Sequence, residues 1–145
     1  MREILFRAKR IDNGEWANGY YVYDYAHNAH FIFKNQLVCP NCINDRRIDY
    51  SLCDYEIDPE TLCKYTGKMD EDGNKIFDGD IVGFIDLYST ESGYSESSCL
   101  GEVVWSEEEC CFHVTNRLSA ESFEVLDECK VVGNVFDNPE LIEEQ

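Results

Sequence analysis

Along much of the chain, apolar side chains alternate with polar ones or gather in short apolar runs. This is the pattern of β-strands that have one or both faces buried. Residues 4–9, 20–23, 31–33, 52–57, 80–85, 101–105, 111–115 and 131–136 are predicted to be strands. We therefore expect roughly eight to ten short strands with little helix.

Gly, Asn, Asp and Pro mark where these segments end. The Asp-Gly pairs at 72–73 and 78–79 predict tight hairpin turns. Residues 58–59 and 138–139 each predict the start of a short helix, because an Asp or Asn can cap the helix and Pro suits its first position. The polar, Ser-rich residues 88–98 predict a mobile loop.

The chain divides into two parts on this pattern. Residues 1–63 are expected to form an N-terminal β region that includes a cysteine-containing loop at residues 36–50. Residues 64–145 contain five short predicted strands, counting the segment 75–77 between the two Asp-Gly turns, and these could close into a small barrel and so remove exposed sheet edges. A single intertwined domain is the alternative. The predicted fold class is mainly β, or a β-rich α+β fold.

The charge is strongly negative and unevenly distributed. Of the 145 residues, 43% are hydrophobic and 29% are charged, as in a folded soluble protein. The net charge of −18 divides into −3 for residues 1–63 (seven basic, ten acidic) and −15 for residues 64–145 (five basic, twenty acidic). Such a surface repels the phosphates of nucleic acids and of anionic lipids. We therefore expect no direct contact with nucleic acid and none with a membrane.

The cysteines raise the question of whether the protein works in an oxidising or a reducing compartment. The chain has eight cysteines and no run of about 18 apolar residues that could cross a membrane. The N-terminal apolar run is also too short for the core of a secretory signal. We therefore expect a cytoplasmic protein with free thiols or metal-bound cysteines rather than disulfides.

One set of residues has spacing that suits a metal. A tetrahedral zinc site could take two pairs of ligands, each pair separated by two residues. These pairs are His27 with His30 and Cys39 with Cys42. Cys53 and Cys63 could replace the histidines. Against zinc, an offset of three residues on a strand points side chains to opposite faces, so free thiols and surface histidines, with no cofactor, are the competing interpretation.

Other chemistry is weakly supported. Asp70, Asp72 and Asn74 resemble the first half of a calcium-binding loop. However, Lys75 and Ile81 occupy the positions where such a loop needs Gly and Glu, and a hairpin turn explains the same residues.

A cysteine nucleophile is also conceivable, since Cys110 and Cys111 are close to His113. The flanking acidic run 107–109 disfavours the thiolate that a nucleophile requires. No phosphate-binding glycine loop is present, and we expect no enzyme and no catalytic residues.

Three stretches of the sequence resemble the YopX family of phage and prophage proteins. They are MREILFRA at residues 1–8, the block from DPET at 58–61 through YTGKMD at 65–70 to GNKIFDGDIV at 73–82, and VGNVFDNPEL at 132–141. The resemblance implies a mainly β fold with a C-terminal SH3-type barrel, self-association, and no established activity. It also implies the cytoplasm of a bacterial host. The cysteines in residues 36–55 depart from the family pattern, as do Cys63 and Lys64, which stand where Gly and Gln are usual.

Three functional hypotheses follow. The first is a non-catalytic module that self-associates and acts through contacts with itself or with a host or phage protein. The second is an acidic inhibitor that mimics DNA and captures a host DNA-binding protein. The third is a zinc-stabilised binding module.

Overall fold

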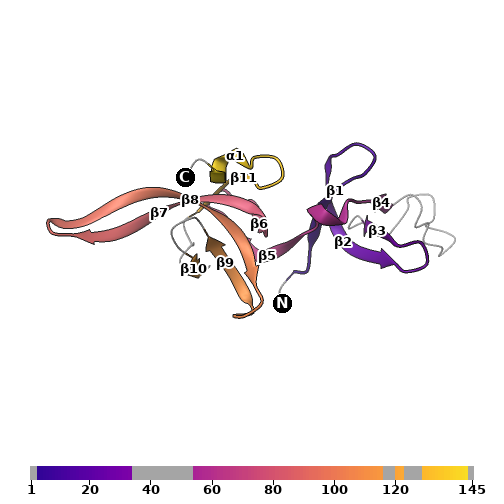
Figure 1. Ribbon diagram of the computed structural model, residues 1–145, viewed down its shortest axis with the longest axis horizontal. Coiled ribbons are helices and arrows are strands. Elements are labelled where there is room, and N and C mark those ends of the chain that lie inside the picture. Colours follow the sequence, from indigo (N-terminus) through magenta and orange to yellow (C-terminus); the bar gives the residue numbers. More distant parts are fainter. Residues whose placement is uncertain (1–2, 34–53, 116–119, 123–128, 144–145) are drawn as a thin grey trace. The chain divides into compact units, whose positions relative to one another are not determined.

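The computed structural model describes residues 3–33, 54–115, 120–122 and 129–143 (Figure 1). The elements are β1 (Phe6–Lys9), β2 (Trp16–Asp24), β3 (Ala29–Phe33), β4 (Asp54–Glu56), η3 (Pro59–Thr61), β5 (Cys63–Met69), β6 (Lys75–Phe77), β7 (Asp80–Thr90), β8 (Gly93–Ser106), β9 (Cys111–Thr115), β10 (Ala120–Ser122), β11 (Lys130–Asn134) and α1 (Glu140–Glu143). The predicted mainly β fold is confirmed. Contacts divide the chain into two compact units, Met1–Tyr65 (unit 1) and Thr66–Gln145 (unit 2). The predicted boundary after residue 63 falls inside β5, which runs from one unit into the other.

Unit 1 is built on antiparallel strands in the order β4-β3-β2-β1-β5. β2 is long enough to pair with β1 through its first half and with β3 through its second half. A hydrophobic cluster holds the strands together. It consists of the buried residues Ala8, Ala17, Ile32 and Ile57, with Phe6, Tyr21, Tyr55 and Leu62 packed against it.

The short helical turn η3 begins where the sequence predicts a helix start. The Asp58 side chain accepts a hydrogen bond from the backbone N–H of Glu60, and Pro59 takes the first position. The buried Thr61 hydroxyl accepts a hydrogen bond from the Lys9 N–H at 2.8 Å and donates to the Asp58 carbonyl at 2.7 Å. This contact fixes η3 against β1.

Unit 2 contains a five-stranded antiparallel sheet in the order β10-β9-β8-β7-β11. Its buried cluster consists of Ile76, Val82, Val103, Phe112, Val114 and Cys129. Because Ile76 belongs to β6, this strand packs against the sheet and completes the core. The predicted C-terminal helix is present as α1, one short turn after Pro139.

Two predictions need correction in unit 2. The Ser-rich residues 88–98 are not a loop; they belong to the long hairpin of β7 and β8, which closes at the pair Thr90↔Gly93. The described strands form an open sheet with β10 and β11 at its ends, and this part of the chain does not confirm the predicted SH3-type barrel. The described end strands β10 and β11 each pair with one neighbour, β9 and β7 respectively, and not with each other, so the sheet stays open between them.

Candidate functional site

The outer half of the β7–β8 hairpin, residues 85–98, is the most distinctive surface feature of unit 2, and we call it the arm. Its strands pair with each other from Ile85↔Ser98 to Thr90↔Gly93. β11 pairs with β7 no further than Gly83, and β9 pairs with β8 only from Glu102 onward. Among the strands that the structure describes, none pairs with the outer edges of the arm, which projects from the rest of unit 2 (Figure 1).

The arm exposes large apolar side chains. Ile85 is 61% exposed and Tyr94 is 86% exposed. The arm sequence has three acidic residues and neither Lys nor Arg. At its tip, the Thr90 hydroxyl donates a hydrogen bond to the Gly93 carbonyl at 3.0 Å and so supports the two-residue turn.

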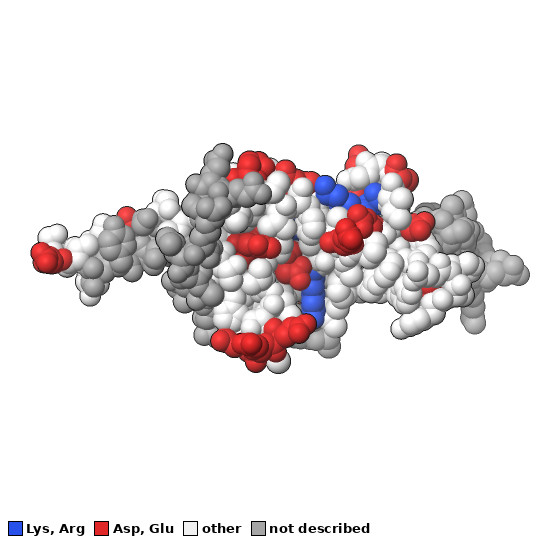
Figure 2. Space-filling view, viewed as in Figure 1, with Lys and Arg blue, Asp and Glu red and all other residues white. Residues whose placement is uncertain are grey.

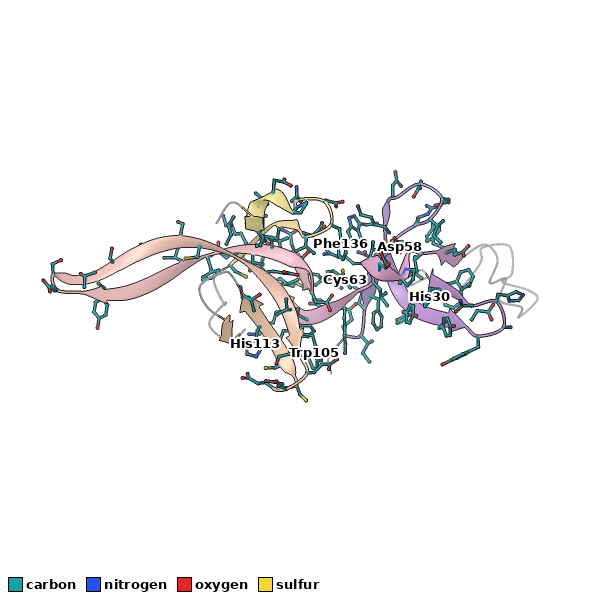
Figure 3. The ribbon with its side chains drawn as sticks, viewed as in Figure 1. His30, Asp58, Cys63, Trp105, His113 and Phe136 are labelled. Carbon is teal, nitrogen blue, oxygen red and sulfur yellow. The ribbon has the colours of Figure 1, made fainter. Side chains whose placement is uncertain are left out.

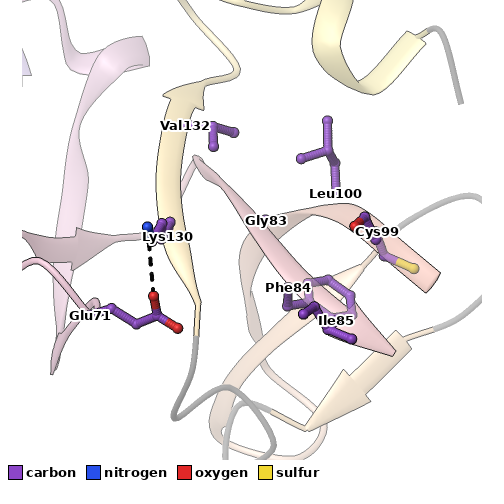
Figure 4. A pocket seen from close by; sticks show the side chains of 9 residues that line it. Glu71, Gly83, Phe84, Ile85, Cys99, Leu100, Lys130 and Val132 are labelled. Atoms are coloured by element: carbon purple, nitrogen blue, oxygen red, sulfur yellow. Dashed lines mark ion pairs between the residues drawn. The ribbon is translucent and has the colours of Figure 1, made fainter. Parts of the chain in front are cut away.

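A shallow apolar hollow of about 320 Å³ lies at the base of the arm (Figure 4). Its walls include Phe84, Ile85, Leu100 and Val132, and an ion pair between Lys130 Nζ and Glu71 Oε2 (3.8 Å) lies at its side. Because Ile85 belongs to both, the hollow and the arm form one continuous surface. It resembles a protein contact more than a small-molecule site, since few polar groups converge in it.

Of the predicted zinc ligands, His27, His30 and Cys63 lie among the described residues, each in a different part of unit 1. The His27 side chain is 80% exposed in the turn after β2, where its Nδ1 lies 2.8 Å from Asp24 Oδ2. This hydrogen bond lowers the pKa of Asp24, against a smaller opposing effect of burial.

His30 lies instead on β3 among aromatic rings (Figure 3). Its Nδ1 makes a 2.5 Å hydrogen bond with the Tyr21 hydroxyl, and its ring centroid is 4.7 Å from that of Tyr23. The two histidines therefore have different partners in unit 1.

The cysteine ligands are mostly beyond what the structure describes. Cys39, Cys42 and Cys53 fall outside the described residues. Cys63 is buried in β5, where its thiol donates to the Thr61 carbonyl at 3.2 Å. The five described cysteines form no disulfide with one another. Burial, reinforced by Asp70 and Glu71, raises the pKa of the Cys129 thiol.

The calcium-like residues form the turn between β5 and β6. Asp70 Oδ1 accepts hydrogen bonds from the N–H groups of Asp72 and Asn74, and Oδ2 accepts from the Asn74 amide and the Val131 N–H. Both carboxylate oxygens are therefore engaged by N–H donors, as the hairpin interpretation requires.

The structure also brings together a group whose metal-binding potential the sequence prediction missed. Cys111 Sγ lies 3.3 Å from His113 Nε2, and the same nitrogen lies 2.7 Å from Glu109 Oε2. The Cys-x-His spacing on a strand was the available signal, because side chains two apart share a face. The turn that returns Glu109 to that face could not be foreseen from spacing.

Comparisons with known proteins identify the family to which the chain is related. A search of curated proteins finds no match. The chain is similar in structure to a protein described as "protein EF1440 from Enterococcus faecalis", whose crystal structure aligns with a TM-score of 0.52 and 22% identity over 98% of this chain and 99% of that one. At this identity the likeness supports the fold alone. The family model for the YopX protein matches residues 5–143, nearly the whole chain, and this chain therefore belongs to the YopX family.

Proposed function

We propose that this protein is a non-catalytic interaction module that self-associates, and that the arm of one copy pairs with the arm of a second copy. The observation that supports the proposal is the pair of open edges along residues 85–98, which no described strand covers. An open strand edge presents N–H and C=O groups that can pair with another strand. The setting we propose is the bacterial cytoplasm in a phage or prophage context.

The energetics of the arm favour a partner. A two-stranded hairpin is only marginally stable in water by itself. Addition of further strands would satisfy its edges and cover the exposed side chains of Ile85 and Tyr94. A second copy is the fitting occupant because two identical antiparallel edges complement each other about a twofold axis. Backbone pairing also does not require side chains of opposite charge on the two arms. The arm sequence has acidic residues but no basic ones.

The DNA-mimic alternative receives less support from the distribution of charge. A mimic needs carboxylates in a continuous row that imitates phosphates. On the face of unit 2 shown in Figure 2, the acidic groups instead gather in separate places, one of them at the turn between β8 and β9. The zinc-stabilised module stays a prediction, because three of its proposed cysteines lie outside the described residues.

Light scattering of the full chain at micromolar concentration tests self-association. We expect a mass of at least twice the 16.8 kDa of one chain. The variant Ile85→Lys places a charge on the arm and should shift the mass toward that of the monomer, because charged residues on an edge oppose strand pairing.

Ile11→Lys is the matched control. Ile11 is 59% exposed, close to the value for Ile85, but it lies in unit 1. This variant should keep the wild-type mass. A wild-type protein that stays at 16.8 kDa over the whole concentration range would contradict the proposal, as would an equal effect of the two substitutions.

A further inference from the structure

We propose that Glu109, Cys111 and His113 form a binding site for one divalent cation of the zinc class. The site lies in unit 2, at the turn between β8 and β9 and on the first residues of β9. It is separate from the zinc ligands predicted around residues 27–42. It is also independent of the arm, so either proposal can fail without the other.

The distances suit a tetrahedral ion. Typical zinc bonds of about 2.0–2.3 Å at tetrahedral angles place nitrogen, oxygen and sulfur ligand atoms roughly 3.3–3.6 Å apart. Cys111 Sγ lies 3.3 Å from His113 Nε2 and 4.0 Å from Glu109 Oε2. The third separation, 2.7 Å between Nε2 and Oε2, is that of a hydrogen bond. An ion would replace the shared proton and move these two atoms apart by a small side-chain rotation.

The local fold explains why three ligands converge here. Phe112 and Val114 point into the core of unit 2, so Cys111 and His113 share the opposite face of β9. Pairing with β8 holds both in place, through Ser106↔Cys111 and Val104↔His113.

The turn supplies the third ligand. Cys110 adopts a positive φ of 53°, a left-handed conformation that is uncommon outside glycine. The chain therefore reverses sharply enough for Glu109 to reach back over His113. The His113 side chain is 12% exposed and that of Glu109 is 65% exposed, so the site opens to solvent on the carboxylate side.

The donor set selects the class of metal. A thiolate, an imidazole and a carboxylate suit zinc and its tetrahedral substitute cobalt, whereas calcium and magnesium prefer oxygen ligands alone. Three protein ligands leave one coordination position for water or for a donor atom of another molecule. Binding requires loss of the thiol proton, which the ion itself promotes.

Titration of the full-length, reduced protein with Co²⁺ tests the site. We expect a thiolate-to-cobalt charge-transfer band that saturates and that Zn²⁺ removes by displacement. Cys111→Ser should abolish the band. His113→Gln removes a group that binds the ion directly. It should therefore weaken binding by more than the roughly 10–100-fold typical for loss of a group that only hydrogen-bonds to a ligand. Glu109→Gln, in an exposed turn that tolerates substitution, should weaken binding while the fold stays intact.

Two controls separate this site from other thiols. Cys110→Ser changes the adjacent exposed thiol and should leave the band unchanged. A variant with both Cys39→Ser and Cys42→Ser should retain the signal that depends on Cys111. Absence of the band in the wild-type protein would overturn the proposal. So would a band that keeps its full intensity when Cys111→Ser is added to the variant that lacks Cys39 and Cys42.

Discussion

Asp70 shows how one side chain can tie distant parts of unit 2 together. Its carboxylate is 7% exposed and accepts hydrogen bonds within its own turn, where the Asn74 N–H lies at 2.8 Å. It also accepts a bond at 3.0 Å from the N–H of Val131 in β11, 61 residues away. Burial alone would raise the pKa of Asp70, but these donors outweigh it, and the pKa lies below its ordinary value.

Substitution of Asp70 should therefore be costly. Asp70→Asn removes the charge and turns an N–H₂ group toward N–H donors, so we expect the free energy of unfolding to fall by about 2–3 kcal/mol. Chemical denaturation measures this loss. Asp72→Asn is the control in the same turn, where the side chain is exposed and the change should stay within about 0.5 kcal/mol. Equal losses in the two variants would contradict this role for Asp70.

The same interaction predicts a pH dependence. A carboxylate with a lowered pKa in the folded state stabilises the protein above its unfolded-state pKa of about 3.9. The stabilisation is lost as the pH falls below that value and through the folded-state pKa. The difference in unfolding free energy between wild type and Asp70→Asn should therefore be constant near neutral pH and shrink below about pH 4. If this difference in unfolding free energy grew as the pH fell, the predicted direction of the pH dependence would be wrong.

At the scale of elements, close approach of strands in unit 1 depends on Gly19. This residue lies in β2, opposite Phe6 of β1, and next to the end of β3. A Cβ atom added at Gly19 would lie 1.7 Å from the Phe33 carbonyl oxygen. The backbone of β2 or β3 would have to move to accommodate it.

Gly19→Ala should consequently lower the free energy of unfolding by about 1–3 kcal/mol or more, the cost typical of overpacking. Thermal or denaturant unfolding measures the effect. Gly83→Ala in β7 is the matched control, because a Cβ there would meet Leu100 at 3.5 Å, an ordinary contact. The account of β2 and β3 is wrong if both alanine variants are equally stable.

The elements that could be predicted are those with one buried face. β1, β9 and the first half of β7 alternate or cluster apolar residues toward a core, and the sequence predicts each of them. Residues 88–98 read as a loop because they are mostly Ser, Thr, Glu and Gly, so no alternation of apolar residues in the sequence indicates a strand there. Hairpin pairing there depends on the turn and on backbone bonds, which leave little hydrophobic pattern.

The candidate metal site shows a similar limit. The spacing of Cys111 and His113 predicts that they lie near each other and also suggests a nucleophile with its base. The same spacing gives Glu109 no role beyond that of a neighbouring negative charge. Its role as a ligand depends on the left-handed conformation at Cys110, a residue type that gives no warning of such a turn.

At the scale of the whole molecule, the net charge of −18 opposes self-association. Salt screens this repulsion, with a Debye length of about 8 Å at 0.15 M ionic strength. We therefore propose that the contact is made by the backbone edges of the arm and by Ile85 and Tyr94, whose interactions do not depend on charge.

Hydrogen exchange of the backbone amides in residues 85–98, measured in dilute and in concentrated solution at 0.15 M salt, tests the central claim most directly. Pairing of two arms would protect their outward-facing amides, so exchange in the arm should slow as concentration rises, while exchange in β1 and β2 stays unchanged. Arm amides that exchange at the same rate at every concentration would contradict the account.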